Sequence, residues 1–295
     1  MPTVSDRSRL ISIVQSRQNA RVRELRAAFA RRGRDASEGI GIEGEHLLAE
    51  ALRSGLRIRT VFVRRSLERT SDRGPAHDPA AEDGRQGNRG SVLRRFNRLG
   101  LPPSVPIVEL IPAVFASAVE TESPQGIAAL VEPPRLSLND ALAGAHPLVV
   151  IAAGLQDPGN LGTLIRSVEA FGASGVLALP GTVNVWNAKV LRASAGSAFR
   201  VPVVYERSAR IFDALAERRI PVLAAVQSGA IPCSQANLRG PAAILVGNEG
   251  SGLSAELLEH AQTRISVPMP GPVESLNAAV AASILLYEAS RQRAA

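Results

Sequence analysis

The chain has 295 residues, enough for one larger and one smaller domain, and 45% of them are hydrophobic, enough to form a sizeable core. A single cysteine excludes a disulfide framework and multi-cysteine zinc sites, and the four histidines lack ligand spacing, so no metal is expected. The net charge of +7 indicates an acidic partner, while the lack of a long apolar run or a secretory signal pattern favours a soluble, cytoplasmic protein without membrane contact.

The first predicted element is a basic helix over residues 10–32, with Val22, Leu25 and Phe29 on its apolar stripe. Residues 1–100 hold 21 arginines against 12 acidic residues, a net charge of +9, whereas the remainder holds 13 basic and 15 acidic residues, a net charge of −2. Such asymmetry predicts an RNA or DNA partner. Codon bias would explain arginine in place of lysine, but not this uneven distribution.

A small α/β domain is predicted up to residue 132. Residues 39–52 predict a strand, a turn at Gly44 and a helix, and residues 59–63 predict a second strand. Residues 70–91 predict a flexible insertion, because they lack the large apolar side chains that would offset the cost of ordering. The strand and helix pattern resumes at 105–110, 111–115 and 125–131, and a linker is predicted over 133–146.

The second predicted domain, residues 147–295, alternates strands and helices. Strands are expected at 147–153, 176–179, 201–205, 222–226, 243–246 and 265–267, and helices at 161–171, 188–199, 209–217, 255–261 and 275–291. Continuous apolar strands between helices predict a parallel sheet covered on both faces. Ligands in such sheets bind beyond the carboxyl ends of the strands.

Three loops at strand ends, residues 157–166, 246–252 and 267–277, combine glycine, proline and polar side chains. Glycine lets the main chain approach a ligand closely, and proline fixes the path of a loop, so the three could form one pocket. Each loop also has a structural interpretation: Asn160 and Ser275 suit helix capping, and Glu249 could tie loops together. The dinucleotide fingerprint and the phosphate-binding lysine loop are absent.

Together, the three loops resemble the motifs of the SpoU (TrmH) family of RNA ribose 2′-O-methyltransferases, in the SPOUT superfamily. The matching positions are Asn160, Gly162 and Arg166, then Gly247, Glu249 and Gly252, then Pro268, Met269, Gly271, Ser275, Leu276 and Asn277. The resemblance implies a parallel sheet with a carboxyl-terminal trefoil knot and a homodimer with its active site at the interface. It also implies S-adenosylmethionine as the methyl donor, without a metal.

The resemblance further assigns roles to individual residues. Gly247, Val267, Met269 and Leu276 would hold the donor, largely through backbone groups and apolar atoms. Arg166 would be the central catalytic residue, supported by the other motif residues, which are Asn160, Glu249, Ser275 and Asn277. Because a guanidinium stays protonated and has no acceptor, we expect Arg166 to position a phosphate and steady the developing alkoxide rather than to remove a proton.

The first domain resembles the L30e-like RNA-binding extension of the same family, on the strength of residues 16–19, the arginines up to Arg34 and residues 42–44. The arginines expected to bind RNA are Arg21, Arg23, Arg31, Arg32 and Arg34. Low aromatic content, 3%, predicts salt-dependent phosphate contacts rather than base stacking. The expected substrate is structured RNA, with 23S rRNA favoured over tRNA.

Two other functions stay open at this point. A non-enzymatic RNA-binding or ribosome-assembly protein could keep the fold without the activity. An enzyme acting on a small phosphorylated metabolite could use the same three loops, but the basic first domain would then have no partner. Binding of the donor and of RNA separates these alternatives.

Overall fold

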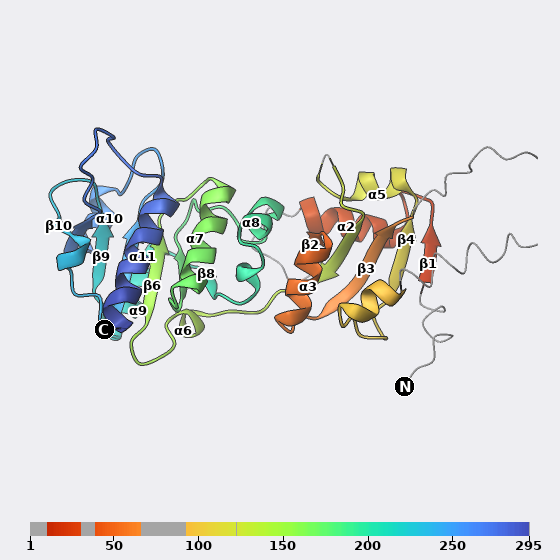
Figure 1. The fold of residues 1–295 in the computed structure, drawn as a ribbon, viewed down its shortest axis with the longest axis horizontal. Coiled ribbons are helices and arrows are strands. Elements are labelled where there is room, and N and C mark those ends of the chain that lie inside the picture. Colours follow the sequence, from red (N-terminus) through yellow and green to blue (C-terminus); the bar gives the residue numbers. More distant parts are fainter. Residues whose placement is uncertain (1–10, 31–38, 66–92, 122, 295) are drawn as a thin grey trace, which may run out of the picture. The chain divides into compact units, whose positions relative to one another are not determined.

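The computed structural model describes residues 11–30, 39–65, 93–121 and 123–294 (Figure 1). The chain divides into two compact units between Pro133 and Pro134. In these described ranges, no helix has the length and apolarity that a membrane crossing requires. The predicted insertion at 70–91 lies outside the described residues.

The amino-terminal unit is built on a five-stranded mixed sheet in the order β1-β4-β3-β5-β2. The strands are β1 (Ile11–Val14), β2 (Ile40–Glu43), β3 (Ile58–Arg64), β4 (Ile107–Leu110) and β5 (Ile127–Val131). β1 and β3 both run parallel to β4, whereas β5 is antiparallel to β3 and β2. All residues of β2, β4 and β5 are buried, and these residues are apolar or small except for Glu43 in β2 and Glu109 in β4.

The helices of this unit are α2 (Ala20–Ala30), α3 (Glu45–Arg53) and α5 (Pro112–Ala118), and residues 93–98 are also helical. The prediction of one helix over residues 10–32 is wrong at its start, because residues 11–14 form β1. Pairing with β4 overrides the local helical spacing there. The helix begins only at Ala20, where the Asn19 side chain accepts a hydrogen bond from the Arg21 amide at 3.0 Å.

The predicted linker holds a short helix, α6 (Leu138–Ala141), that the sequence analysis missed. Ser137 and Asp140 form a capping box, in which each side chain satisfies the backbone amide of the other residue. The hydrogen bonds from Ser137 lower the pKa of the Asp140 carboxyl. The spacing Ser-x-x-Asp is the signal that would have predicted this helix.

The carboxyl-terminal unit contains a seven-stranded sheet in the order β10-β12-β9-β11-β6-β7-β8, and every pairing in it is parallel. The strands are β6 (Leu148–Ala152), β7 (Gly175–Ala178), β8 (Val203–Tyr205), β9 (Val222–Ala225), β10 (Ile231–Pro232), β11 (Ala242–Val246) and β12 (Thr263–Ser266). The predicted parallel sheet is confirmed. The short edge strand β10 was not predicted.

Helices cover this sheet and connect its strands (Figure 1). They are α7 (Pro158–Ala170), α8 (Ala188–Ala193), α9 (Ser208–Glu217), α10 (Ala255–Glu259) and α11 (Ala278–Ala294), with 3-10 turns η2 (Ser197–Phe199) and η3 (Cys233–Gln235). The prediction of a continuous helix over 188–199 is wrong. The chain turns at Ala195 and Gly196, with φ of 50° and 93°, values that an α-helix cannot contain.

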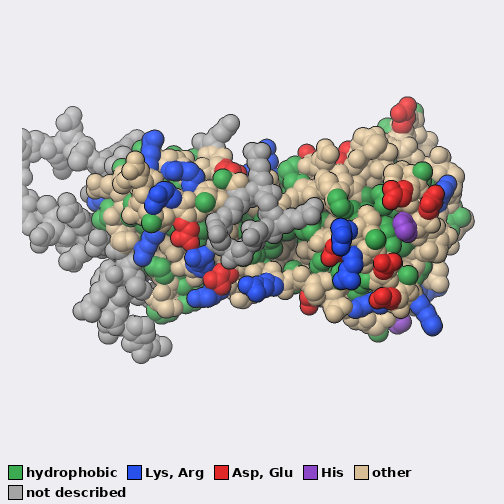
Figure 2. Space-filling view, turned by 180° about the vertical axis from the view of Figure 1, so that it is seen from behind, with side chains coloured by type: hydrophobic (Ala, Val, Ile, Leu, Met, Phe, Trp, Pro, Cys, Tyr) green, Lys and Arg blue, Asp and Glu red, His purple; other side chains and the backbone are tan. Residues whose placement is uncertain are grey.

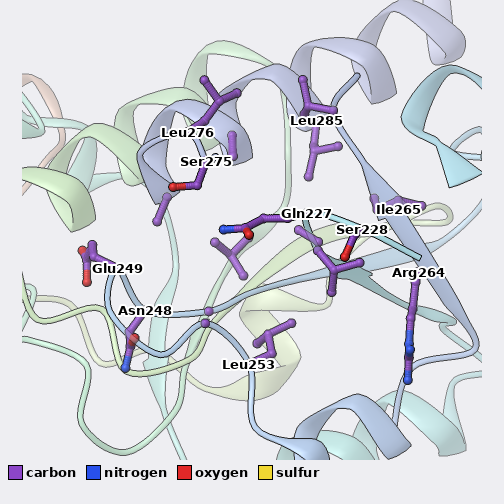
Figure 3. Close-up of a pocket in the computed structure, with 18 of the residues that line it drawn as sticks. Gln227, Ser228, Asn248, Glu249, Leu253, Arg264, Ile265, Ser275, Leu276 and Leu285 are labelled. Atoms are coloured by element: carbon purple, nitrogen blue, oxygen red, sulfur yellow. The ribbon is translucent and has the colours of Figure 1, made fainter. Parts of the chain in front are cut away.

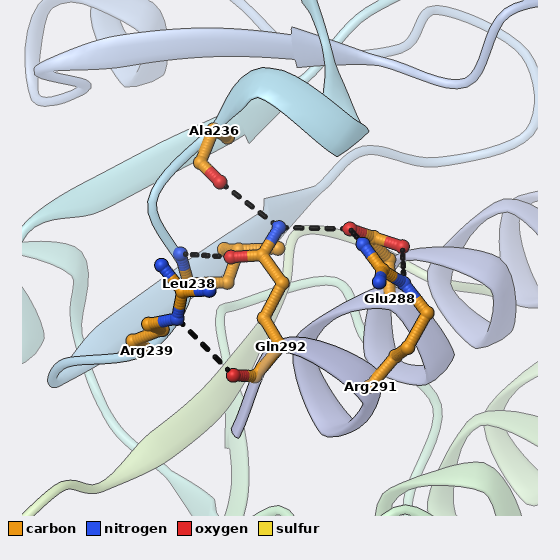
Figure 4. Close-up of polar contacts among 6 residues, drawn as sticks. All are labelled: Ala236, Leu238, Arg239, Glu288, Arg291 and Gln292. Carbon is orange, nitrogen blue, oxygen red and sulfur yellow. Dashed lines mark hydrogen bonds and ion pairs between the residues drawn. The ribbon is translucent and has the colours of Figure 1, made fainter. Parts of the chain in front are cut away.

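The carboxyl end of α11 is fixed by a buried polar cluster (Figure 4). The Gln292 side chain donates to the Ala236 carbonyl and accepts from the Leu238 amide, both at 3.0 Å. Glu288 in turn accepts hydrogen bonds at 2.8 Å from Gln292 and from Arg291. The two bonds to Ala236 and Leu238 tie the last helix to the segment that leads into β11, and Glu288 holds the Gln292 side chain in place.

We predict that Glu288→Gln destabilises the protein at neutral pH but not in strong acid. Hydrogen bonds from Arg291 and then Gln292 lower the pKa of Glu288 from 4.5 to about 2. A carboxyl with a lowered pKa stabilises the fold above pH 4.5, and this contribution is lost as the pH falls toward 2. Urea unfolding should show a loss of about 1 kcal/mol at pH 7.

The difference between wild type and Glu288→Gln should shrink steadily below pH 4.5. Glu217, an exposed glutamate on α9, is the matched control, and its change to Gln should have little effect on the free energy of unfolding. A pH-independent difference for Glu288→Gln would contradict the assigned role.

Candidate active site

Three predicted motifs meet through one side chain, the carboxamide of Asn160. Its Nδ2 donates to Glu249 Oε1 at 2.6 Å, and its Oδ1 accepts from Asn277 Nδ2 at 2.8 Å. These residues belong to the segments that follow β6, β11 and β12. The carboxyl ends of these parallel strands therefore supply one connected polar cluster, as expected for a ligand site in such a sheet.

Local capping leaves Asn160 available for this role. The amino-terminal cap of α7 is Asp157, whose Oδ1 accepts from the Asn160 amide at 2.9 Å, so the expectation that Asn160 caps the helix is wrong. Similarly, α11 is capped by Asn277, which accepts from the amides of Ala279 and Val280, rather than by Ser275. Ser275 lies two residues before this cap, with an exposed side chain.

The loop after β11 folds back on itself at Gly247. A Cβ there would lie 2.4 Å from both the carbonyl carbon and the oxygen of Gly252, a distance that no side chain can occupy. Gly252 has a φ of 68°, and Asn248 Oδ1 accepts from the Gly250 and Ser251 amides at 3.0 and 2.7 Å. Glycine at 247 is therefore required by the crossing of the backbone.

Gly162 serves a packing role on α7. A Cβ at this position would lie 2.4 Å from the Cβ of Ala193, because α7 and α8 are in close contact. On its other side α7 packs against α11, where the hydroxyls of Ser167 and Ser283 are 2.7 Å apart. Arg166, two turns into α7, is exposed and makes no hydrogen bond or ion pair with the described residues.

A cavity of about 500 Å³ lies beside this cluster (Figure 3). All four residues expected to hold the donor line it: Gly247, Val267, Met269 and Leu276. Of the five expected catalytic residues, Glu249 and Ser275 line the cavity. Asn160 is hydrogen-bonded to Glu249 of the cavity wall, and Asn277 is hydrogen-bonded to Asn160. Arg166 is not among the described lining residues.

The sequence analysis missed part of the cavity wall. Ala225, Val226, Gln227 and Ser228 line it at the end of β9, and Leu253, Leu258, Ile265 and Leu285 add apolar surface. The signal for the β9 loop was available, because polar residues follow a predicted strand of the same parallel sheet. Clusters of His, Cys, Asp or Glu able to hold a metal were not found among the described residues.

Arginines of the amino-terminal unit are conspicuous on the face shown in Figure 2. Arg21 and Arg23 are exposed on α2, and Arg21 donates to the Ser12 hydroxyl at 3.4 Å. Arg31, Arg32 and Arg34 lie outside the described residues. Arg94 and Arg98, which the sequence analysis did not single out, are also exposed and form no ion pair within the described ranges.

Comparison with known proteins agrees with this arrangement. Residues 147–287 match the SpoU rRNA Methylase family, and residues 19–129 match the MRM3-like substrate binding domain. The chain is 34% identical over 275 residues to the 23S rRNA (guanosine(2553)-2′-O)-methyltransferase RlmP of Bacillus subtilis, covering 93% of this chain and 97% of that protein. The chain belongs to the SpoU rRNA methylase family.

Solved structures of SpoU enzymes have the same fold. AviRb of Streptomyces viridochromogenes, in complex with AdoMet, aligns with a TM-score of 0.75 at 27% identity, covering 94% of this chain and 99% of that one. An AdoMet-bound rRNA methyltransferase of Sinorhizobium meliloti gives 0.73 at 27% identity, covering 96% and 98%. Membership confirms the predicted activity, that of an RNA ribose 2′-O-methyltransferase using S-adenosylmethionine.

The cavity fits such a donor. Its volume lies within the usual range for small-molecule sites, about 300–1,000 Å³. Gly247 contributes backbone groups to the wall, and Leu253, Ile265 and Leu285 offer apolar cover for a flat base. The walls thus combine the apolar and backbone polar groups that an adenosyl group requires.

We predict that Gly247→Ala lowers the free energy of unfolding by about 1–3 kcal/mol, because the added methyl forces the loop apart. Gly250→Ala is the matched control, since its Cβ would meet nothing closer than Asn248 Oδ1 at 3.9 Å. Urea unfolding of both variants measures the difference. Equal stabilities would show that the backbone crossing at Gly247 relaxes without cost.

Proposed function

We propose that this SpoU enzyme methylates a ribose 2′-hydroxyl in 23S rRNA, with tRNA as the second candidate substrate. The observation that carries the proposal is the Asn160 cluster, which joins the three motif segments at the edge of the donor-sized cavity. RlmP, which is similar over 93% of the chain, is named as a 23S rRNA enzyme and supports the choice of RNA.

In this proposal the backbone at Gly247, Val267 and Leu276 holds the adenosyl part, and the Met269 side chain covers it. Bound there, S-adenosylmethionine supplies an electrophilic methyl group on its sulfonium. Glu249 and Ser275, which also line the cavity, contact the ribose side of the site. Asn160 and Asn277 keep Glu249 in place through their hydrogen bonds.

Arg166 is proposed to clamp the phosphate beside the target ribose. Its guanidinium is exposed and has no protein partner within the described ranges, so its donors are available to RNA. A planar fork suits bidentate contact with phosphate and with a developing alkoxide, but it cannot accept a proton. We therefore propose that Arg166 positions the phosphate and stabilises the negative charge of the developing alkoxide.

We further propose a trefoil knot in the carboxyl-terminal unit and a homodimer. The return of α11, which follows the loops after β11 and β12 in the chain, to pack against α7 supports the knot. Val280 and Tyr287, 45% and 56% exposed on α11, offer an apolar surface to a second copy. The active site around Arg166 would then also contain groups from the partner subunit.

The amino-terminal unit is proposed to be an L30e-like domain that selects the RNA. Its match to a substrate binding domain and its exposed arginines, including Arg21 and Arg23, support this role. Phosphate contacts from such side chains give affinity without reading sequence. The proposed site of action is the cytoplasm.

The test of the function is methyl transfer from tritiated S-adenosylmethionine to unmodified 23S rRNA and to bulk tRNA, followed by nucleoside mass analysis. We expect a 2′-O-methylated nucleoside from 23S rRNA. Arg166→Ala should reduce kcat/KM at least 100-fold, because the phosphate clamp is lost, while donor affinity is unchanged. Arg210→Ala, an exposed arginine on α9, should leave the rate unchanged.

Full turnover by Arg166→Lys would contradict a fork-shaped clamp. Methylation of tRNA alone would replace the proposed substrate. Donor binding without transfer to either RNA would favour a metabolite enzyme.

We predict that Arg21→Ala with Arg23→Ala weakens RNA binding without changing kcat. In a plot of the logarithm of the RNA association constant against the logarithm of the salt concentration, each lost phosphate contact should make the negative slope shallower by about 0.7–0.9. Filter binding of a 23S rRNA fragment at several salt concentrations measures this slope. An unchanged slope would remove α2 from the RNA surface.

A further inference from the structure

The loop after β9, residues 226–229, lies outside the three motif loops yet forms part of the donor cavity. β9 is hydrogen-bonded to both β11 and β12, so its carboxyl end emerges between the loops that follow those two strands. Gln227 and Ser228 consequently line the cavity. The strand order itself places polar side chains of this loop beside the donor.

Gln227 differs from Asn248 and Glu249, two other polar residues of the cavity wall, in having a free side chain among the described residues. Asn248 Oδ1 accepts hydrogen bonds within its own loop, and Glu249 accepts one from Asn160. Gln227 is exposed and has no hydrogen-bond partner among the described residues. In Figure 3 its carboxamide points into the middle of the cavity, on the side of Ser275. The Gln227 carboxamide therefore does not stabilise the described part of the fold through a hydrogen bond.

The chemistry of a carboxamide fits the polar edges of a nucleoside. It offers one acceptor and two donors without charge, as required beside ring nitrogens, an exocyclic amine or ribose hydroxyls. Apolar side chains around it, Leu253, Ile265 and Leu285, suit the flat faces of a base. A neutral group also avoids an electrostatic penalty beside a cationic sulfonium.

We propose that Gln227 is a specificity-determining residue that hydrogen-bonds the adenosyl group of the methyl donor. This inference rests on the proposed function, because it uses the same cavity. It adds a side-chain contact to a site otherwise attributed to backbone groups and apolar atoms. Since the carboxamide supports no other part of the described structure, its removal should leave the fold intact.

The test is calorimetric binding of S-adenosylhomocysteine to the full chain. Gln227→Leu keeps much of the side-chain volume and removes the polar atoms, and it should raise Kd about 3- to 10-fold, as expected for one or two net hydrogen bonds. Gln235→Leu is the matched control, because Gln235 is exposed on η3 outside the cavity. The control should bind like the wild type, and both variants should keep the melting temperature of the unliganded protein.

In methyl-transfer assays, Gln227→Leu should raise KM for the donor and leave kcat at saturating donor within about twofold, since a uniform binding contact is removed. An inosine analogue of S-adenosylhomocysteine separates the two halves of the nucleoside. If Gln227 contacts the base, the wild type should lose affinity for the analogue and the variant should not. If it contacts the ribose, both should lose affinity equally.

Wild-type affinity in Gln227→Leu would overturn the inference and leave the proposed function standing. If the wild type binds S-adenosylhomocysteine but methylates neither rRNA nor tRNA, the proposed function fails while the role of Gln227 in binding is still decided. Failure of the wild type to bind S-adenosylhomocysteine would overturn both.

Discussion

The active-site end of the protein depends on one side chain, the carboxamide of Asn160. Its Nδ2 donates to one motif segment and its Oδ1 accepts from another, so the one side chain connects all three segments. Glu249 and Asn277 come from loops about 90 and 120 residues later in the chain, so local sequence cannot hold them together. Asp157 and Asn277 cap α7 and α11, which fixes the helices from which these contacts are made.

The parallel sheet could be predicted from the sequence because its strands are buried on both faces and are therefore apolar throughout, as in β6 and β11. The motif loops could be predicted because they contain glycines that the backbone demands, as at Gly247. The same reasoning failed at β1, which becomes a strand only by pairing with β4, far along the chain. Long-range pairing leaves no local signature.

At the site, the residues of the three loops were predicted, but their contacts and the wall formed by Gln227 were not. A motif identifies which residue types recur, whereas the order β12-β9-β11 decides which further loop lies among them. Capping was assigned to Asn160 and Ser275, although both Asp157 and Asn277 have equally suitable side chains. Helix-capping preferences alone cannot choose between polar residues two or three positions apart.

The polar cluster at the end of α11 has a consequence for the order of assembly. Leu276, Ala281 and Leu285 form one wall of the cavity, and all three belong to α11 or the segment just before it. During synthesis every other wall leaves the ribosome first. The cavity stays open on that side until α11 docks and Gln292 engages Ala236 and Leu238. The chain can thus bind the donor only after α11 has docked, because a nascent chain that lacks this helix has an incomplete cavity.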